Sequence, residues 1–192
     1  MKKYFSKSAQ IALVLVYLVI FAGAFVRLTG SGMGCPDWPK CFGYYIPPTE
    51  QSELLFASGK EYDKGQVIIK EESLLVAKTD FVSTSNFDAA NWEKYTKHDY
   101  AIFNPIHTWV EYINRLLGAL AGIACVITFG LSFGYWKENK KIIMLTFLIC
   151  ALMGFQAWLG KTVVDSVLNP FKITTHMLAA LLIVALQLIV IY

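Results

Sequence analysis

Charged residues are scarce in this chain of 192 residues, because Asp, Glu, Lys and Arg together make up only 16% of it. A soluble domain carries about a quarter. The shortage excludes an ordinary soluble domain, since the hydrophobic residues, 56% of the chain, are gathered in long blocks. The net charge of +3 is small, and no basic patch interleaved with aromatic residues is present. The sequence therefore gives no support to a nucleic-acid partner.

The four cysteines do not include a Cys-x-x-Cys pair. That absence counts against a thiol–disulfide exchange enzyme, the least favoured of the functions considered. Cys35 and Cys41 are close enough in sequence to bond to each other, in a loop rich in glycine and proline. Cys125 and Cys150 fall inside apolar blocks and are predicted to be inert core residues.

Four apolar blocks each reach the roughly 18–20 residues that a helix needs to cross a bilayer. Backbone N–H groups in the hydrocarbon core must be bonded internally, so the blocks are predicted to be helices. The sequence thus predicts an all-α membrane protein, a single four-helix transmembrane domain over residues 1–192, with helices at about 8–27, 105–136, 142–160 and 172–192. The apolar stretch of the first block is too long for a signal peptide, so it is predicted to be a retained span.

Lysines predict how the bundle is oriented. Lys2, Lys3 and Lys7 precede the first block, and Lys137, Lys140 and Lys141 join the second to the third. The positive-inside rule puts both groups in the cytoplasm, in a bacterial cytoplasmic (inner) membrane. The loop 28–104 is then outside, where a Cys35–Cys41 disulfide persists. Its part from Gln51 to Tyr100 is expected to form a small ordered cap with some strand character, with a floppy insertion as the alternative.

Ionisable and polar residues inside the predicted spans are functional candidates by default, and here they gather at one depth. His107, Glu111 and Asn114 follow one another at spacings of four and three, so they share a helix face. All four predicted helices contribute to this set, whose other members are Arg27, Arg115, Lys161, Asp165 and His176. Each has a simpler explanation: Arg27 as an interfacial arginine, His176 as a hydrogen-bonded bundle histidine, and Glu111 with Arg115 as an intrahelical ion pair.

The shared depth of these groups predicts an outer pocket for a large, planar, anionic ligand. Haem fits that description, because histidine ligates iron, arginine pairs with propionates, and apolar helix walls accept the macrocycle. Arg27, Asn114, Arg115 and His176, at this depth, are the candidate cofactor-binding residues.

Three segments resemble the haem A synthase family, whose members convert haem O to haem A for cytochrome oxidase. They are residues 26–32 (VRLTGSG) leading to 35–41 (CPDWPKC), residues 111–116 (EYINRL), and residues 156–164 (QAWLGKTVV) leading to Thr175-His176. The second resembles the family's Glu-x-x-His-Arg motif. The resemblance covers the chain apart from about Gln51 to Tyr100, and it points to the N-terminal half of an eight-helix family.

The resemblance implies a stepwise oxidation of a haem methyl group to a formyl group. It assigns catalysis to Glu111, iron ligation to His176, and the outer-loop disulfide to Cys35 and Cys41. It implies haem O as substrate, haem b as a further candidate cofactor, and membrane lipid, haem O synthase and cytochrome oxidase assembly factors as partners. The family's eight-helix design further implies that this chain works with a second four-helix half or as a homo-oligomer.

Asn114 departs from the family pattern, because it stands where the motif has histidine. An asparagine amide is a poor iron ligand, so His176 alone is favoured as the ligand, with His107 as the alternative. The substitution also keeps open a function of another class, a haem-binding electron-transfer or haem-handling membrane subunit without its own catalysis.

Overall fold

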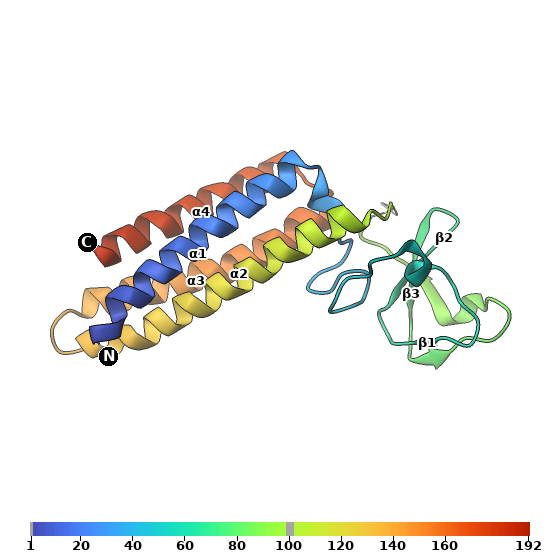
Figure 1. Cartoon of the computed structure of the whole chain (residues 1–192), viewed down its shortest axis with the longest axis horizontal. Coiled ribbons are helices and arrows are strands. Elements are labelled where there is room, and N and C mark those ends of the chain that lie inside the picture. Colours follow the sequence, from blue (N-terminus) through green and yellow to red (C-terminus); the bar gives the residue numbers. More distant parts are fainter. Residues whose placement is uncertain (1, 99–101) are drawn as a thin grey trace. The chain divides into compact units, whose positions relative to one another are not determined.

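The computed structural model describes residues 2–98 and 102–192, which form two compact units (Figure 1). The bundle unit consists of Met1–Leu28, Ile113–Val163 and Asn169–Tyr192, and the cap unit consists of Thr29–Tyr112 and Val164–Leu168. Tyr100, the predicted end of the cap segment, lies outside the described residues. Each unit is considered separately below.

Four helices form the bundle unit: α1 (Lys2–Leu28), α2 (Pro105–Ser132), α3 (Lys140–Asp165) and α4 (Pro170–Ile191). The first residues of α2 and the last of α3 belong to the cap unit. A short 3-10 helix, η4 (Phe133–Tyr135), follows α2 directly. All four helices are long and apolar enough to cross a membrane, so the chain is a multi-pass membrane protein, as its apolar blocks predict.

Helix ends follow local chemistry. The Asn104 and Asn169 side chains each accept a backbone N–H at 3.0 Å, from Ile106 and Phe171, and a proline begins each helix. The helix α1 begins at Lys2 rather than near residue 8, and α3 continues to Asp165 rather than ending near residue 160. Hydropathy marks only the part of a helix that lies in lipid. The helical hydrogen bonds of the backbone continue into the polar residues on either side of that part.

The bundle core draws on every helix. It consists of Ala12, Val16, Ala121, Ala124, Cys125, Ile149, Ile183 and Val184. The N-terminus and the α2–α3 link lie at the same end, because Lys2 pairs with Glu138 and the Phe5 ring lies 5.2 Å from that of Tyr135. The lysines before the first apolar block and those between the second and third therefore lie at the same end of the bundle, as their positions in the sequence predicted.

The cap unit contains β-structure, so the predicted all-α class describes only the bundle. Strands β1 (Glu61–Tyr62) and β4 (Phe81–Val82) form one antiparallel pair, and β2 (Val67–Lys70), β3 (Ser73–Ala77) and β5 (Trp92–Lys94) form a three-stranded antiparallel sheet in the order β2-β3-β5. Three 3-10 helices complete the unit: η1 (Ser31–Met33), η2 (Gln51–Leu54) and η3 (Ala89–Asn91). An ordered cap with strand character was the favoured expectation for this segment.

Aromatic side chains hold the cap together. Tyr62, Ile68, Ala77 and Trp92 form a buried cluster, in which the Tyr62 and Trp92 rings meet edge to face at 5.0 Å. A second cluster surrounds Cys35, Cys41 and Phe42 and connects the disulfide loop to the sheet. The sheet therefore supports the loop that the sequence singled out.

Candidate functional site

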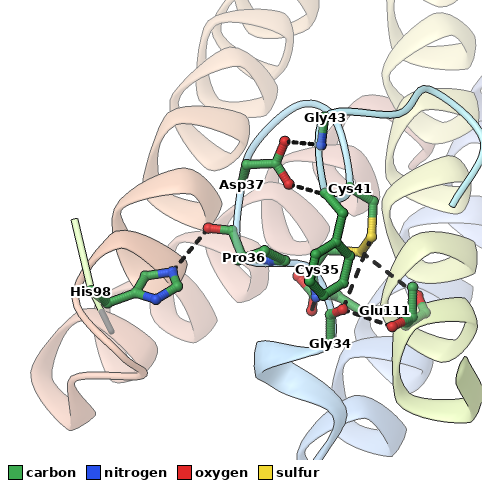
Figure 2. Close-up of a disulfide and its surroundings, with 10 residues drawn as sticks. Gly34, Cys35, Pro36, Asp37, Cys41, Gly43, His98 and Glu111 are labelled. Carbon is green, nitrogen blue, oxygen red and sulfur yellow. Dashed lines mark hydrogen bonds between the residues drawn. A yellow bond between two sulfur atoms is a disulfide. The ribbon is translucent and has the colours of Figure 1, made fainter. Parts of the chain in front are cut away.

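The loop that follows α1 is closed by a disulfide between Cys35 and Cys41 (Figure 2). The Asp37 carboxylate closes it a second time, because it accepts the backbone N–H groups of Phe42 at 2.6 Å and Gly43 at 2.8 Å. Charge-assisted bonds of this kind are stronger than neutral ones. The loop is therefore fixed at both ends of its turn.

The disulfide loop is attached to the first turns of α2. The backbone N–H of Cys35 donates to Glu111 Oε2 at 2.8 Å, and Thr108 Oγ1 donates to the carbonyl oxygen of Gly34 at 2.8 Å (Figure 2). Glu111 is 4% exposed and Thr108 is fully buried. A buried carboxylate needs such partners, so the loop holds Glu111 in one position.

Gly34 allows this close approach. A Cβ atom at this position would lie 2.4 Å from the carbonyl oxygen of His107 and 2.7 Å from the backbone nitrogen of Thr108. Both neighbours are backbone atoms of α2, which cannot rotate out of the way. Any residue larger than glycine would therefore separate the loop from the helix.

We expect Gly34→Ala to break the bond between Cys35 and Glu111. The amide hydrogen of Cys35 should then exchange with solvent at least about tenfold faster, since about 1.4 kcal/mol of local protection corresponds to that factor. Hydrogen exchange read by mass spectrometry of the loop peptide measures the effect. Gly118→Ala on the same helix, where a Cβ meets nothing within 4 Å, is the control. Unchanged exchange in Gly34→Ala would contradict the attachment.

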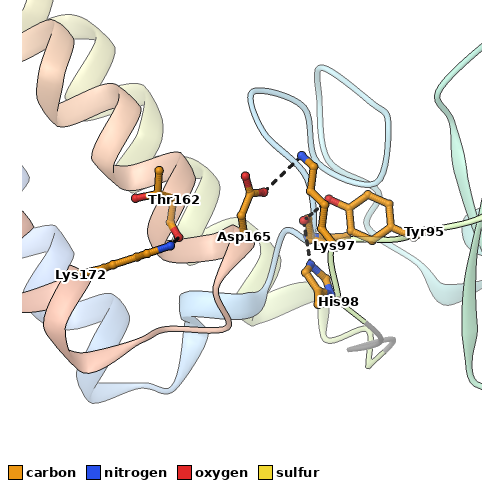
Figure 3. Close-up of polar contacts among 7 residues, drawn as sticks. Tyr95, Lys97, His98, Thr162, Asp165 and Lys172 are labelled. Atoms are coloured by element: carbon orange, nitrogen blue, oxygen red, sulfur yellow. Dashed lines mark hydrogen bonds and ion pairs between the residues drawn. The ribbon is translucent and has the colours of Figure 1, made fainter.

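His98 is a buried residue of the cap that the sequence analysis did not select. Its Nε2 donates to the carbonyl oxygen of Pro36 at 3.0 Å, and Tyr95 Oη donates to the same oxygen at 2.9 Å. The neighbouring Lys97 pairs with Asp165 at 3.2 Å (Figure 3). His98 follows a mixed polar segment with no apolar periodicity, so the sequence held no signal that it would contact the disulfide loop.

His176 lies on α4 within the bundle unit, where α3 provides its neighbours. The Gln156 side chain donates through Nε2 to the His176 carbonyl oxygen at 2.9 Å. A Cβ atom added to Gly160 would lie 3.6 Å from His176 Cε1, so the imidazole packs against a glycine. Arg27 is within electrostatic range of His176. The bundle unit thus brings together two of the predicted ligand-binding residues.

Four buried polar atoms of the bundle unit have no hydrogen-bond partner within residues 2–98 and 102–192. One is Gln187 Oε1, and the other three are Asn114 Oδ1, Gln156 Oε1 and His176 Nδ1. Buried polar atoms in native proteins are almost always satisfied, so these atoms call for an explanation. A Cβ at Gly23 of α1 would lie 3.9 Å from Asn114 Oδ1. Asn114, Gln156 and His176 lie on α2, α3 and α4. Two of them, Asn114 and His176, are residues from which the sequence predicted a ligand-binding site.

Gln156 is a further residue of the candidate site, and the sequence pattern alone assigns it no role. An uncharged polar residue within an apolar helix is itself a signal, and α3 carries it one turn before Gly160. Arg115, half-buried, follows Asn114 on α2. His107 belongs to the cap unit together with Glu111, and its backbone packs against Gly34.

These residues fit a haem. A porphyrin supplies four ligands to its own iron and needs only an axial imidazole from the protein, and His176 provides an imidazole beside a glycine. Arginines suit the propionates, and both Arg27 and Arg115 belong to the bundle unit. No group of three or more His, Cys, Asp and Glu side chains suited to a bare metal ion occurs in the described part of the chain.

The fold and these residues define a helical multi-pass membrane protein with a disulfide-bearing cap. The family model described as "Cytochrome oxidase assembly protein" matches residues 7–83 and 83–192, so the chain belongs to that family. No solved structure matches it.

Similar curated proteins carry the name "Heme A synthase". The protein of Shewanella oneidensis is 28% identical over 180 residues, which cover 94% of this chain and 42% of that protein. The protein of Ehrlichia canis is 27% identical over 175 residues, covering 88% and 43%, and that of Wolbachia pipientis is 25% identical over 179 residues, covering 90% and 44%. The chain therefore spans less than half the length of these relatives.

Proposed function

We propose that this protein is an oxidoreductase of haem A biosynthesis that binds haem O and oxidises one of its methyl groups stepwise to a formyl group. The relatives' name supports a role in haem A synthesis, and the unpartnered buried atoms of Asn114, Gln156 and His176 support a polar ligand in the bundle unit. The proposal puts the protein in the bacterial cytoplasmic membrane, with its N-terminus in the cytoplasm and its cap outside.

His176 is proposed as the axial ligand of the haem iron. Asn114 stands at the motif's histidine position, and its amide oxygen is a poor iron ligand. Its unpartnered Oδ1 is instead suited to accept a hydrogen bond from a polar group of the bound ligand or from a water beside it. His107 stays the alternative ligand, although it lies about 10 Å from Asn114 along the axis of α2.

Arg27 and Arg115 are proposed to pair with the two propionates. Paired propionates fix the rotation of the porphyrin about its iron, and that rotation decides which methyl group is presented for oxidation. A fixed orientation matters here because the methyl groups of a porphyrin are chemically similar. Arg27 is exposed at the end of α1, and Arg115 is half-buried on α2.

Glu111 is proposed as the catalytic residue. Oxidising a methyl group to a formyl group with oxygen from water releases electrons to an external oxidant and also releases protons, and a carboxylate accepts the protons. One Glu111 oxygen is occupied by the Cys35 N–H, so the disulfide loop fixes the orientation of the carboxylate. In a site that excludes water, a fixed charge also acts strongly on any positive charge that develops during the reaction.

A second function has one observation in its favour. Asn114 replaces the motif histidine, which suits a haem-binding electron-transfer or haem-handling subunit without its own catalysis. Both functions need His176, but only the first needs Glu111.

The proposed partners stay haem O, a second four-helix half or a second copy, haem O synthase and cytochrome oxidase assembly factors.

The deciding experiment is expression of the intact chain in a host that makes haem O, followed by extraction and chromatography of the haems. We expect haem A, or a partly oxidised haem O, at levels above those of a host without the chain. Bound haem O that stays unchanged, also when a relative's second half is co-expressed, would favour the haem-handling subunit. An absence of any retained haem would exclude both functions.

A further inference from the structure

The lysine-rich end of the bundle carries an apolar groove that none of the proposed chemistry uses. It has a volume of about 320 Å³ and is lined by Phe129, Phe133 and Trp136 from α2 and η4 and by Ile143, Met144 and Phe147 from α3. Most of these side chains are exposed in the bundle, with Met144 at 64% and Phe147 at 60%.

Aromatic rings line the groove in series. The Phe129 ring lies 5.2 Å from that of Phe133 and 5.8 Å from that of Phe147, and Phe133 is stacked on Trp136 at 6.0 Å. Aromatic rings at a helix end are typical of the boundary between lipid tails and headgroups. A row of rings of this kind provides an apolar channel suited to a hydrocarbon chain.

Positive charge surrounds the mouth of the groove. The Lys140 ammonium group is part of its lining and lies 5.5 Å from the centre of the Trp136 ring. Lys137 and Lys141, which follow Trp136 and Lys140 directly in the sequence, are also exposed. Glu138 is the acidic residue of this link, and it is already paired with Lys2. The mouth therefore carries an excess of positive charge that calls for an anionic group.

We propose that this groove binds one anionic phospholipid, whose acyl chain lies along the aromatic rings and whose phosphate pairs with Lys137, Lys140 and Lys141. Basic pockets between membrane helices are known to hold anionic headgroups. A second protein copy would fill an apolar groove but would leave the lysines without an anion. The proposal does not depend on the haem chemistry.

Native mass spectrometry of the detergent-purified chain tests the site, by titration with phosphatidylglycerol and with phosphatidylcholine of the same acyl chains. We expect the anionic lipid to be retained at least about tenfold more tightly. Replacing Lys137, Lys140 and Lys141 together by glutamine should abolish this preference. The same charge loss at Lys64, Lys78 and Lys94 of the cap unit should leave it intact.

A groove-filling variant tests the acyl-chain part. Met144 is exposed, so Met144→Trp should fold normally, fill the groove and reduce retention of phosphatidylglycerol. Equal retention of both lipids, or no effect of the three lysine changes, would overturn the proposal. So would glycerol phosphate binding as tightly as the whole lipid, because the groove would then have no role. A dimer that Met144→Trp dissociates would assign the groove to a second copy instead.

Discussion

Replacing Glu111 by glutamine is expected to stop the oxidation of haem O while the protein still folds and still retains haem. Loss of a group that transfers protons costs about 100-fold or more in rate. Glutamine keeps a side-chain oxygen that accepts the Cys35 N–H, which donates to Glu111 at 2.8 Å. The change therefore removes the titratable group and preserves its attachment to the loop.

Two readouts separate catalysis from structure in this experiment. Chromatography of the extracted haems measures conversion, and hydrogen exchange of the Cys35 amide measures whether the loop is attached. Glu111→Gln should lose only conversion, whereas Glu111→Ala should lose both. Glu93, exposed on β5, provides the matched control, because Glu93→Gln removes a carboxylate of the cap unit without a contact to the loop. Full conversion by Glu111→Gln would remove Glu111 from the mechanism.

Gly34→Ala offers an independent test of the same attachment. It leaves the Glu111 carboxylate intact but should separate the loop from α2, because the added Cβ meets the His107 carbonyl oxygen at 2.4 Å. If conversion depends on how the carboxylate is oriented, Gly34→Ala should lower it even though every catalytic group is present. Comparing the loss of conversion in Gly34→Ala with that in Glu111→Gln then separates the effect of the carboxylate's position from the effect of its charge.

The bundle was predictable from sequence because one physical cause dominates it. A backbone in hydrocarbon must form helices, so four apolar blocks gave four helices. The helix ends were less predictable, since Lys2 and Lys3 extend α1 into a region where charge no longer costs much. The all-α class left out the small sheets, for which the sequence indicated only some strand character in the cap, because their short strands carry a weak periodic signal.

The site was predictable only where a polar residue contrasts with apolar surroundings. Asn114 and His176 stand out in that way, and both have unpartnered buried atoms in the structure. The bond from Cys35 to Glu111 joins residues 76 positions apart, which no local spacing indicates. His98 was missed for the same reason, since its contact with Pro36 spans 62 positions from within a polar segment.

Replacing His176 by alanine is expected to have the largest effect on haem binding. The iron would lose its proposed axial imidazole, and retention of haem O should weaken by at least about tenfold, equivalent to 1.4 kcal/mol. The visible spectrum of the purified chain, with its Soret band, measures retention and ligation together. Because the His176 side chain packs against Gly160, its removal leaves space, so added imidazole should restore part of the absorption.

The chain offers its own controls for this prediction, because it contains three histidines. His98→Ala should leave the haem spectrum unchanged, since His98 donates to Pro36 within the cap unit. His107→Ala distinguishes the two proposed ligands. If His107→Ala bleaches the spectrum and His176→Ala does not, the axial ligand lies at the start of α2 and the haem is bound by a different face of the protein. If both changes are needed to bleach the spectrum, two imidazoles ligate the iron, and His107, two turns before Asn114 on α2, takes the place of the missing motif histidine.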